Sequence, residues 1–284
     1  MRRAGTRPGR HRLDHRPGRT AGRRAAGRML PGVERTPMKS ADETRSVLGR
    51  ALAILETFSN ERPEQTLGMI TRSTGLPAAT VHRLLAELVG WGAVERVGRG
   101  RYQVGMRLWQ LGSLAPGGRG LRDAALPFLE DLFEATHQVV HLGVLDGRSV
   151  LYVEKLMARP EVEVVSRVGR RLPLHSTGPG KVLLAYAPPV LFHEVVAAGL
   201  PRLATNTITD PDVLRQTLAE IRRTGFCVSR DEMTQGASSV AAPVFGPGRD
   251  VVASISVVVP SSTTNLHSLV PAVRMAASGI SRAL

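Results

Sequence analysis

The stretch LGMITRSTGLPAATVHRLLAELVG, at residues 67–90, constrains the fold of this chain more than any other part of it. Two apolar-patterned segments are separated there by a Gly-Leu-Pro break at residues 75–77. In the second segment, apolar residues recur at i, i+3, i+4 and i+7, the spacing of one buried helical face: Val81, Leu84, Leu85 and Leu88. Two short helices joined by a tight glycine turn predict a helix-turn-helix, although an ordinary helical hairpin on a protein surface has the same pattern. The flanking sequence decides between the two.

The segments on either side complete a larger pattern. Before the stretch, residues 45–58 carry an apolar stripe at helical spacing, which predicts a first helix. After it, residues 93–97 and 101–104 are strand candidates around a glycine-flanked turn at 98–100. Three helices followed by an arginine-bearing hairpin predict a winged helix-turn-helix at residues 44–105 that binds double-stranded DNA. The wing would reach phosphates or the minor groove through three arginines: Arg96, Arg99 and Arg101.

The rest of the chain alternates strand and helix patterns. Residues 106–120 hold a short connecting helix and a Pro-Gly-Gly break, which predict a linker. In residues 121–284 we expect helices and strands at these places: helices at 121–132, 178–187, 191–198, 211–223 and 266–284, and strands at 139–145, 149–155, 162–168, 240–244 and 251–259. Hairpins mixed with helices predict a second domain of the α+β class with a mainly antiparallel sheet.

Length and cysteine content narrow the class of protein. A chain of 284 residues allows roughly two domains. The single cysteine, Cys227, excludes an internal disulfide framework and a multi-cysteine zinc site, which fits a reducing cytoplasm. No run of about eighteen apolar residues occurs, so we expect no membrane span.

The net charge of +14 is concentrated at the N-terminus. Residues 1–38 contain eleven arginines against two acidic residues and few apolar ones, so we expect residues 1–40 to be a disordered tail. Such a tail could be a basic arm that adds nonspecific phosphate contacts. The other interpretation is that translation starts further on, at Met29 or Met38.

The segment STGPGK at residues 176–181 superficially suggests a phosphate-binding loop. The first glycine of that motif is replaced here by His175, and Lys181 is followed by Val182 instead of Ser or Thr. What remains is a glycine-rich turn into a helix, whose free backbone N–H groups can bind a small carboxylate. A plain tight turn is an equally good interpretation of these residues.

No set of residues predicts catalysis or metal binding. His137 and His141 have the spacing of helical metal ligands, but the valines between them predict a strand and no third ligand is evident. No serine lies in a Gly-x-Ser-x-Gly elbow, and the apolar context of Cys227 is typical of a core residue. We therefore expect no metal, no cofactor, no nucleophile–base pair and no enzymatic activity. The residues leave two rival functions open: an enzyme acting on a small acid through the C-terminal domain, and a DNA-binding protein that senses nothing.

A series of motifs along residues 44–284 resembles the IclR family of bacterial transcriptional regulators. In order, the motifs are TGLPAATVHRLLAELVGWGAVER, RYQVGMRLWQLG, RRLPLHSTGPGKVLLA, DEMTQGASSVAAPVF, ASISVVVP and ISRAL. The resemblance implies an N-terminal winged helix-turn-helix and a C-terminal GAF-like effector domain, assembled as homodimers or homotetramers on palindromic operators. It also implies that a small, commonly carboxylate-bearing metabolite sets the repression or activation of a catabolic or neighbouring operon.

The same resemblance assigns site residues. DNA contacts fall on Thr80, His82 and Arg83, with the wing arginines in support. Effector contacts fall on eight positions: Leu172, Gly178, Pro179, Ser229, Ala237, Ser239, Ser254 and Ser256. The chain departs from the family at Ala78-Ala79, where Lys or Ser is common, and at Ser229, where a family member can use Asp. The last two serines are two apart on a strand, so we expect their hydroxyls on the same side, as ligand contacts or as satisfied core hydroxyls.

Overall fold

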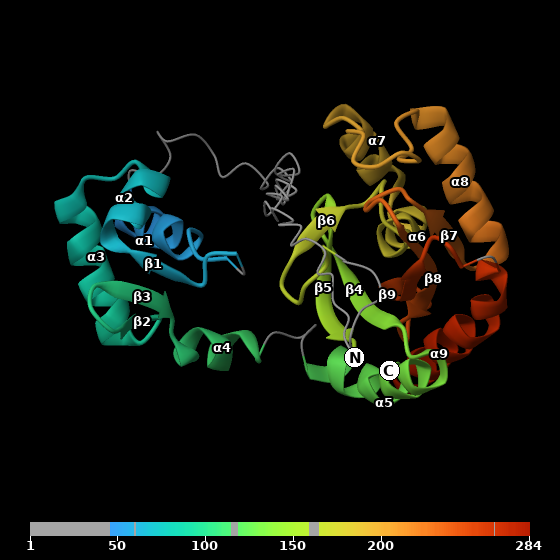
Figure 1. The fold of residues 1–284 in the computed structure, drawn as a ribbon, viewed down its shortest axis with the longest axis horizontal. Helices are drawn as coiled ribbons and strands as arrows, with labels where there is room; N and C mark the ends of the chain where they lie inside the picture. The colour runs from blue at the N-terminus through green and yellow to red at the C-terminus, as the bar shows by residue number, and fades with distance from the viewer. Residues whose placement is uncertain (1–45, 60, 115–118, 159–164, 264) are drawn as a thin grey trace, which may run out of the picture. The chain divides into compact units, whose positions relative to one another are not determined.

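The computed structural model describes residues 46–59, 61–114, 119–158, 165–263 and 265–284. The described elements form an N-terminal unit, coloured blue to teal in Figure 1, and a C-terminal unit, coloured green to red. The expected N-terminal tail at residues 1–40 and the Pro-Gly-Gly break at 116–118 lie outside the described residues.

The N-terminal unit is the winged helix-turn-helix that the sequence predicts. Its helices and strands are α1 (Val47–Leu55), β1 (Glu64–Thr66), α2 (Leu67–Thr74), α3 (Ala78–Trp91), β2 (Val94–Val97) and β3 (Arg101–Val104). Thr66 caps α2, because its hydroxyl accepts a hydrogen bond from the backbone N–H of Met69 at 3.3 Å. Gly75 ends α2 with a positive φ of 71°, a conformation that glycine adopts without steric cost. The predicted first helix, helix-turn-helix and hairpin are therefore confirmed.

The wing sheet contains one strand that the sequence did not reveal. Its strand order is β1-β3-β2, with both pairs antiparallel. The hairpin of β2 and β3 is the predicted one, whereas β1 has only three residues, too few for an alternating pattern to be recognised. A short helix, α4 (Met106–Gly112), follows the wing where a connecting helix was expected.

The C-terminal unit is built on a six-stranded sheet with the order β6-β5-β4-β9-β8-β7. Every neighbouring pair in it is antiparallel, which confirms the α+β class and the sheet type. The strands are β4 (Val139–Asp146), β5 (Ser149–Leu156), β6 (Arg171–Pro173), β7 (Cys227–Arg230), β8 (Ala237–Phe245) and β9 (Val251–Pro260).

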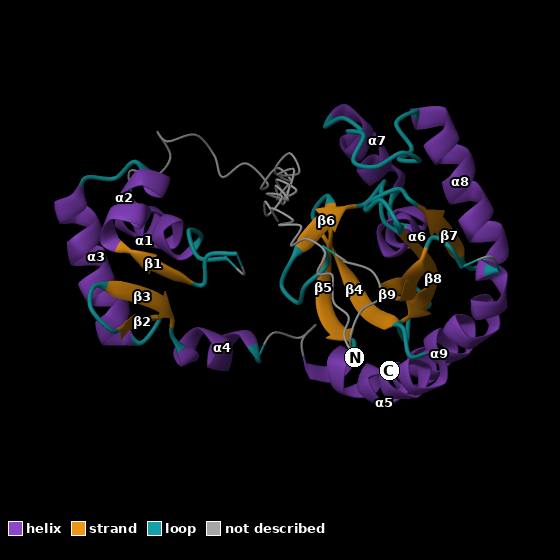
Figure 2. Cartoon of the chain, in the orientation of Figure 1, coloured by secondary structure: helices purple, strands orange, loops and turns teal. Residues whose placement is uncertain are grey.

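Helices cover both faces of this sheet (Figure 2). One face packs against α5 and α9, and the other against α6, with α8 packed behind α6. The helices are α5 (Arg119–Thr136), α6 (Gly178–Tyr186), α7 (Pro189–Ala197), α8 (Pro211–Thr224) and α9 (Val270–Ala283), the last preceded by the 3-10 turn η2 (Leu266–Leu269). The side chain of Asp210 caps α8 and Gly225 ends it at a φ of 76°, as predicted.

The neighbouring strands β8 and β9 have faces of different character. The side chains of one face are all apolar, and they pack toward α5 and α9: Val240, Ala242 and Val244 on β8, and Ala253, Ile255, Val257 and Val259 on β9. The side chains between them are mostly small or hydroxylated: Ser239, Ala241, Ser254 and Ser256. Because successive side chains of a strand point to opposite faces, the second set faces α6. A layer of small polar residues under a helix leaves room for a cavity.

One predicted strand of the C-terminal unit needs correction, and two short strands were not predicted. The strand expected at 162–168 falls partly outside the described residues, and residues 165–168 are not in a strand. One edge of the sheet is instead β6, whose three residues are too few to show a period of two. The strand β7 was also missed, because CVSR, residues 227–230, has no clear alternation of apolar and polar side chains.

Candidate functional site

The outer face of α3 carries the side chains that can reach DNA. Val81, Leu84 and Leu85 are buried in the core of the N-terminal unit, so the opposite face is left outside. On that face His82 and Arg83 are exposed and Thr80 is half-buried. The helix begins after Pro77 without a side-chain cap, so its first backbone N–H groups have no partner within the helix. These N–H groups can contact a phosphate where Ala78 and Ala79 offer no side-chain donor.

The three wing arginines have different surroundings. Arg96 donates a hydrogen bond to the hydroxyl of Tyr102 at 3.3 Å, and its guanidinium lies 5.6 Å from the centre of that ring. Arg101 pairs with Glu64 of β1, with 2.9 Å between Nη1 and Oε2. Arg99 is exposed at the tip of the turn and has no ion pair or side-chain hydrogen bond within the described part of the chain. It is therefore the wing arginine with a free guanidinium.

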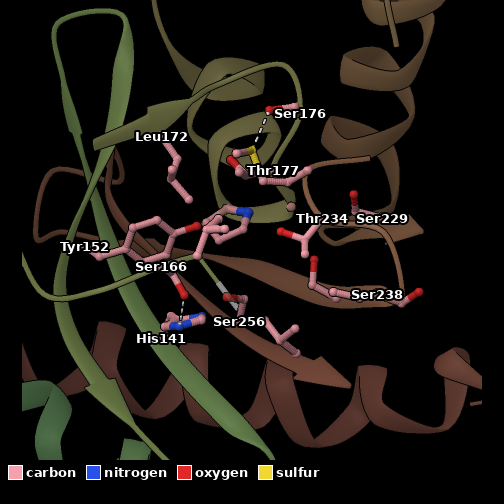
Figure 3. A pocket seen from close by; sticks show the side chains of 17 residues that line it. His141, Tyr152, Ser166, Leu172, Ser176, Thr177, Ser229, Thr234, Ser238 and Ser256 are labelled. Carbon is pink, nitrogen blue, oxygen red and sulfur yellow. Dashed lines mark hydrogen bonds between the residues drawn. The ribbon is translucent and has the colours of Figure 1, made fainter. Parts of the chain in front are cut away.

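The C-terminal unit contains a pocket between the sheet and the start of α6 (Figure 3). The pocket holds about 440 Å³ of space not filled by atoms, part of it open to solvent. It is lined by apolar and neutral polar residues: His141, Tyr152, Val165, Ser166, Leu172, Ser176, Thr177, Gly178, Pro179, Ser229, Met233, Thr234, Ala237, Ser238, Ser239, Ser256 and Val258. None of these is Lys, Arg, Asp or Glu. Apolar walls with a few convergent polar groups are typical of a site for a small molecule.

The start of α6 lies close against β8. A Cβ atom on Gly178 would come within 2.6 Å of the hydroxyl of Ser239, so a larger residue would require that hydroxyl to move. Thr177 fixes the turn: its hydroxyl accepts from the N–H of Gly180 at 3.1 Å and donates to the carbonyl of Pro173 at 3.0 Å. The glycine-rich turn thus brings the N-terminal end of a helix to the pocket wall.

The two serines on β9 differ in their hydrogen bonding. Both are fully buried. Ser254 lies outside the pocket lining and donates to the carbonyl of Ala242 at 3.1 Å. Ser256 lines the pocket, and its hydroxyl has no hydrogen-bond partner among the described residues. An unpartnered buried hydroxyl is costly to a folded protein, and a ligand in the pocket would relieve that cost.

The pocket therefore brings together seven of the eight residues that the family resemblance assigns to the effector: Leu172, Gly178, Pro179, Ser229, Ala237, Ser239 and Ser256. They come from β6, β7, β8, β9 and α6, which are distant in sequence. Ser254 is the residue that the structure places elsewhere.

The pocket also contains a serine–histidine pair that the sequence did not reveal. The hydroxyl of Ser166 lies 2.7 Å from Nε2 of His141. Burial lowers the pKa of His141 to about 3, with a smaller contribution from the nearby ammonium of Lys155. A base with that pKa is too weak to take a proton from serine near neutral pH. The pair is therefore a neutral hydrogen-bonding group.

Neither a metal site nor a membrane span is found in the part of the chain that the structure describes. No three His, Cys, Asp or Glu side chains there are grouped so that they could hold a metal ion. No described helix is both long and apolar enough to cross a membrane. Cys227 is buried, and burial raises the pKa of its thiol, which suits a core residue.

A winged helix-turn-helix followed by a domain with a small-molecule pocket defines a class: transcriptional regulators with a ligand-binding domain. Comparisons with known proteins identify the family. Residues 117–282 match the bacterial transcriptional regulator IclR C-terminal family, and residues 47–98 match the IclR helix-turn-helix domain. The chain belongs to the IclR family of bacterial transcriptional regulators.

Individual relatives agree with this assignment. The HTH-type transcriptional regulator XynR of Escherichia coli is 33% identical over 209 residues, which are 73% of this chain and 83% of XynR. The glycerol operon regulatory protein of Streptomyces coelicolor is 34% identical over 211 residues, or 74% of this chain and 83% of that protein. These relatives are named as regulators, which supports a DNA-binding regulator over an enzyme.

A similar solved structure contains a small molecule. It is an IclR homolog from Microbacterium hydrocarbonoxydans complexed with 4-hydroxybenzoate, and it is 36% identical to this chain. The TM-score is 0.81, and the match covers 84% of this chain and 99% of that one. The IclR of Thermotoga maritima is 28% identical, with a TM-score of 0.68 and coverage of 83% and 97%.

Proposed function

We propose that this chain is a regulator whose affinity for its operator changes when a small organic acid occupies the pocket of the C-terminal unit. It acts as a homodimer or homotetramer on a palindromic operator and controls a catabolic or neighbouring operon, as the family resemblance implies. The observation that carries the proposal is the fully buried, unpartnered hydroxyl of Ser256 in a pocket with apolar walls. A polar ligand atom in the pocket would provide this hydroxyl with a hydrogen-bond partner.

A carboxylate is the ligand group that best fits this side of the pocket. The N-terminal end of α6 carries partial positive charge, and Gly178 holds it against the pocket beside Ser239. Hydroxyl donors on β8 and β9 complete the surroundings of the ligand group. The 4-hydroxybenzoate in the Microbacterium structure is an acid of suitable size, so it serves as the probe.

Two serine substitutions test this proposal. We expect Ser256→Ala to weaken binding of 4-hydroxybenzoate by roughly 10- to 100-fold, because a hydrogen bond to a charged group contributes about 1.5–3 kcal/mol. The same change should raise the free energy of unfolding of the ligand-free protein by about 1 kcal/mol, since it removes an unpartnered buried hydroxyl. Isothermal titration calorimetry and urea unfolding measure the two effects.

Ser254→Ala is the matched control, because the two serines are equally buried and lie on the same strand. It removes the hydrogen bond to Ala242, so we expect about 1 kcal/mol less stability and unchanged affinity for the acid. Equal affinities of wild type and Ser256→Ala would refute the assignment of the ligand to this hydroxyl.

A further inference from the structure

Three buried side chains of the pocket are not assigned to the carboxylate in the proposed function. His141, Tyr152 and Ser166 are 2%, 3% and 4% exposed, and all three line the pocket. His141 is on β4 and Tyr152 on β5, on one side of the central strand β9, whereas Ser229 and Ser239 are on β7 and β8, on its other side. Figure 3 shows the three side chains gathered at the end away from Ser229 and Thr234. We call this set the neutral pole.

The neutral pole is connected to the unpartnered serine. His141 and Ser256 are direct partners in the register of β4 and β9, so their side chains are neighbours on the pocket face of the sheet. Ser166 contacts Nε2 of His141 at 2.7 Å, and the ring of Tyr152 meets the imidazole edge with 4.9 Å between centroids. A ligand that reaches Ser256 therefore lies within reach of these groups.

The polar groups of the pole are uncharged. Burial lowers the pKa of His141 far below neutral pH and raises that of the Tyr152 phenol. A neutral imidazole, a phenol and a serine hydroxyl can each both donate and accept a hydrogen bond. Lys155 lies nearby, but its ammonium donates to the backbone carbonyl of Ser166 at 2.8 Å and is not among the lining residues.

We propose that the neutral pole binds a hydroxyl group of the ligand, so that the effector is a hydroxy-substituted acid instead of an unsubstituted acid or a diacid. A hydroxyl both donates and accepts, which matches groups that do the same. A second carboxylate would be desolvated at the pole without a cationic lining residue, which is unfavourable. This inference rests on the proposed function, which places the carboxylate of the same ligand at the start of α6.

Calorimetric titration of the full chain with three para-substituted probes tests the pole. We expect 4-hydroxybenzoate to bind about tenfold or more tightly than benzoate, and terephthalate to bind most weakly. His141→Phe keeps an aromatic ring beside Tyr152 but removes the nitrogens. The readout is the ratio of the two affinities: this variant should bind 4-hydroxybenzoate no more tightly than benzoate. Ser166→Ala, a smaller change, should reduce the preference for the hydroxyl.

The outcomes separate the two proposals. If benzoate and 4-hydroxybenzoate bind equally well, or if both variants keep the preference for the hydroxyl, the proposed role of the neutral pole is wrong. The proposed binding of a carboxylate in the pocket is then unaffected. Tighter binding of terephthalate than of 4-hydroxybenzoate also overturns the proposed role of the neutral pole. If none of the three acids gives a binding heat, the proposed function fails for this class of acid and the pole fails with it.

Discussion

Lys181→Met is expected to lower the free energy of unfolding of the C-terminal unit by about 3–5 kcal/mol. Lys181 on α6 forms an ion pair with Glu232, and the two side chains are only 1% and 8% exposed. The second carboxylate oxygen of Glu232 has no hydrogen-bond partner among the described residues. Removing the ammonium leaves that carboxylate buried and uncompensated, which is the reason for the large effect.

The double variant Lys181→Met, Glu232→Leu separates the loss of the ion pair from the burial of an unpaired charge. Replacing a buried pair by apolar side chains is often neutral or stabilising, so the double variant should recover most of the lost stability. Urea unfolding followed by far-UV circular dichroism measures it. Both tryptophans, Trp91 and Trp109, precede residue 115, so their fluorescence reports the N-terminal part separately. This account is contradicted if the free energy of unfolding of the single variant is within about 1 kcal/mol of that of wild type. It is also contradicted if the double variant is no more stable than the single variant.

Arg83→Ala is expected to weaken binding to the preferred operator by roughly 1–3 kcal/mol and to relax sequence preference. Arg83 is exposed on the outer face of α3, the helix that a winged helix-turn-helix places in the major groove. With Ala78 and Ala79 at the helix start, few other side chains can read base edges there. Binding titrations on a duplex selected by the wild-type chain from a randomised library, and on random duplex, give both quantities.

Arg99→Ala provides the comparison on the wing. The free guanidinium of Arg99 at the turn tip suits a phosphate contact. This variant should therefore weaken binding to the selected and to the random duplex about equally, and it should reduce the slope of log affinity against log salt concentration by about one. If Arg83→Ala shows that same pattern, Arg83 contacts a phosphate and the base-reading role is refuted.

Sequence reasoning succeeded where local rules determine the structure. The stripe on α3, the Thr66 cap, the left-handed Gly75 and the Asp210 cap each depend on residues close in sequence. It failed for the short strands β1, β6 and β7, whose existence depends on neighbours elsewhere in the sheet. Three or four residues carry too little periodicity to reveal them.

The residues of the candidate site also fall into two groups: those that a local motif indicates and those whose contacts join distant parts of the chain. Motif resemblance pointed to Gly178 and Ser256, whose positions follow from a turn and a strand. The pairing of His141 with Ser166 joins β4 to a loop, and that of Lys181 with Glu232 spans 51 positions. No local pattern encodes such contacts. The glycine-rich turn illustrates this: its lysine resembled that of a phosphate loop, but it is buried against a carboxylate.

Operator affinity measured with and without 4-hydroxybenzoate tests the central claim, that pocket occupancy controls DNA binding. The titration uses the full chain, a selected duplex, and acid at a concentration that calorimetry shows to be saturating. We predict a 5- to 150-fold change in operator affinity, the usual range of coupling between two sites. At the same concentration Ser256→Ala should show a smaller change. If the acid saturates the pocket and the operator affinity of wild type stays the same, the claim is wrong.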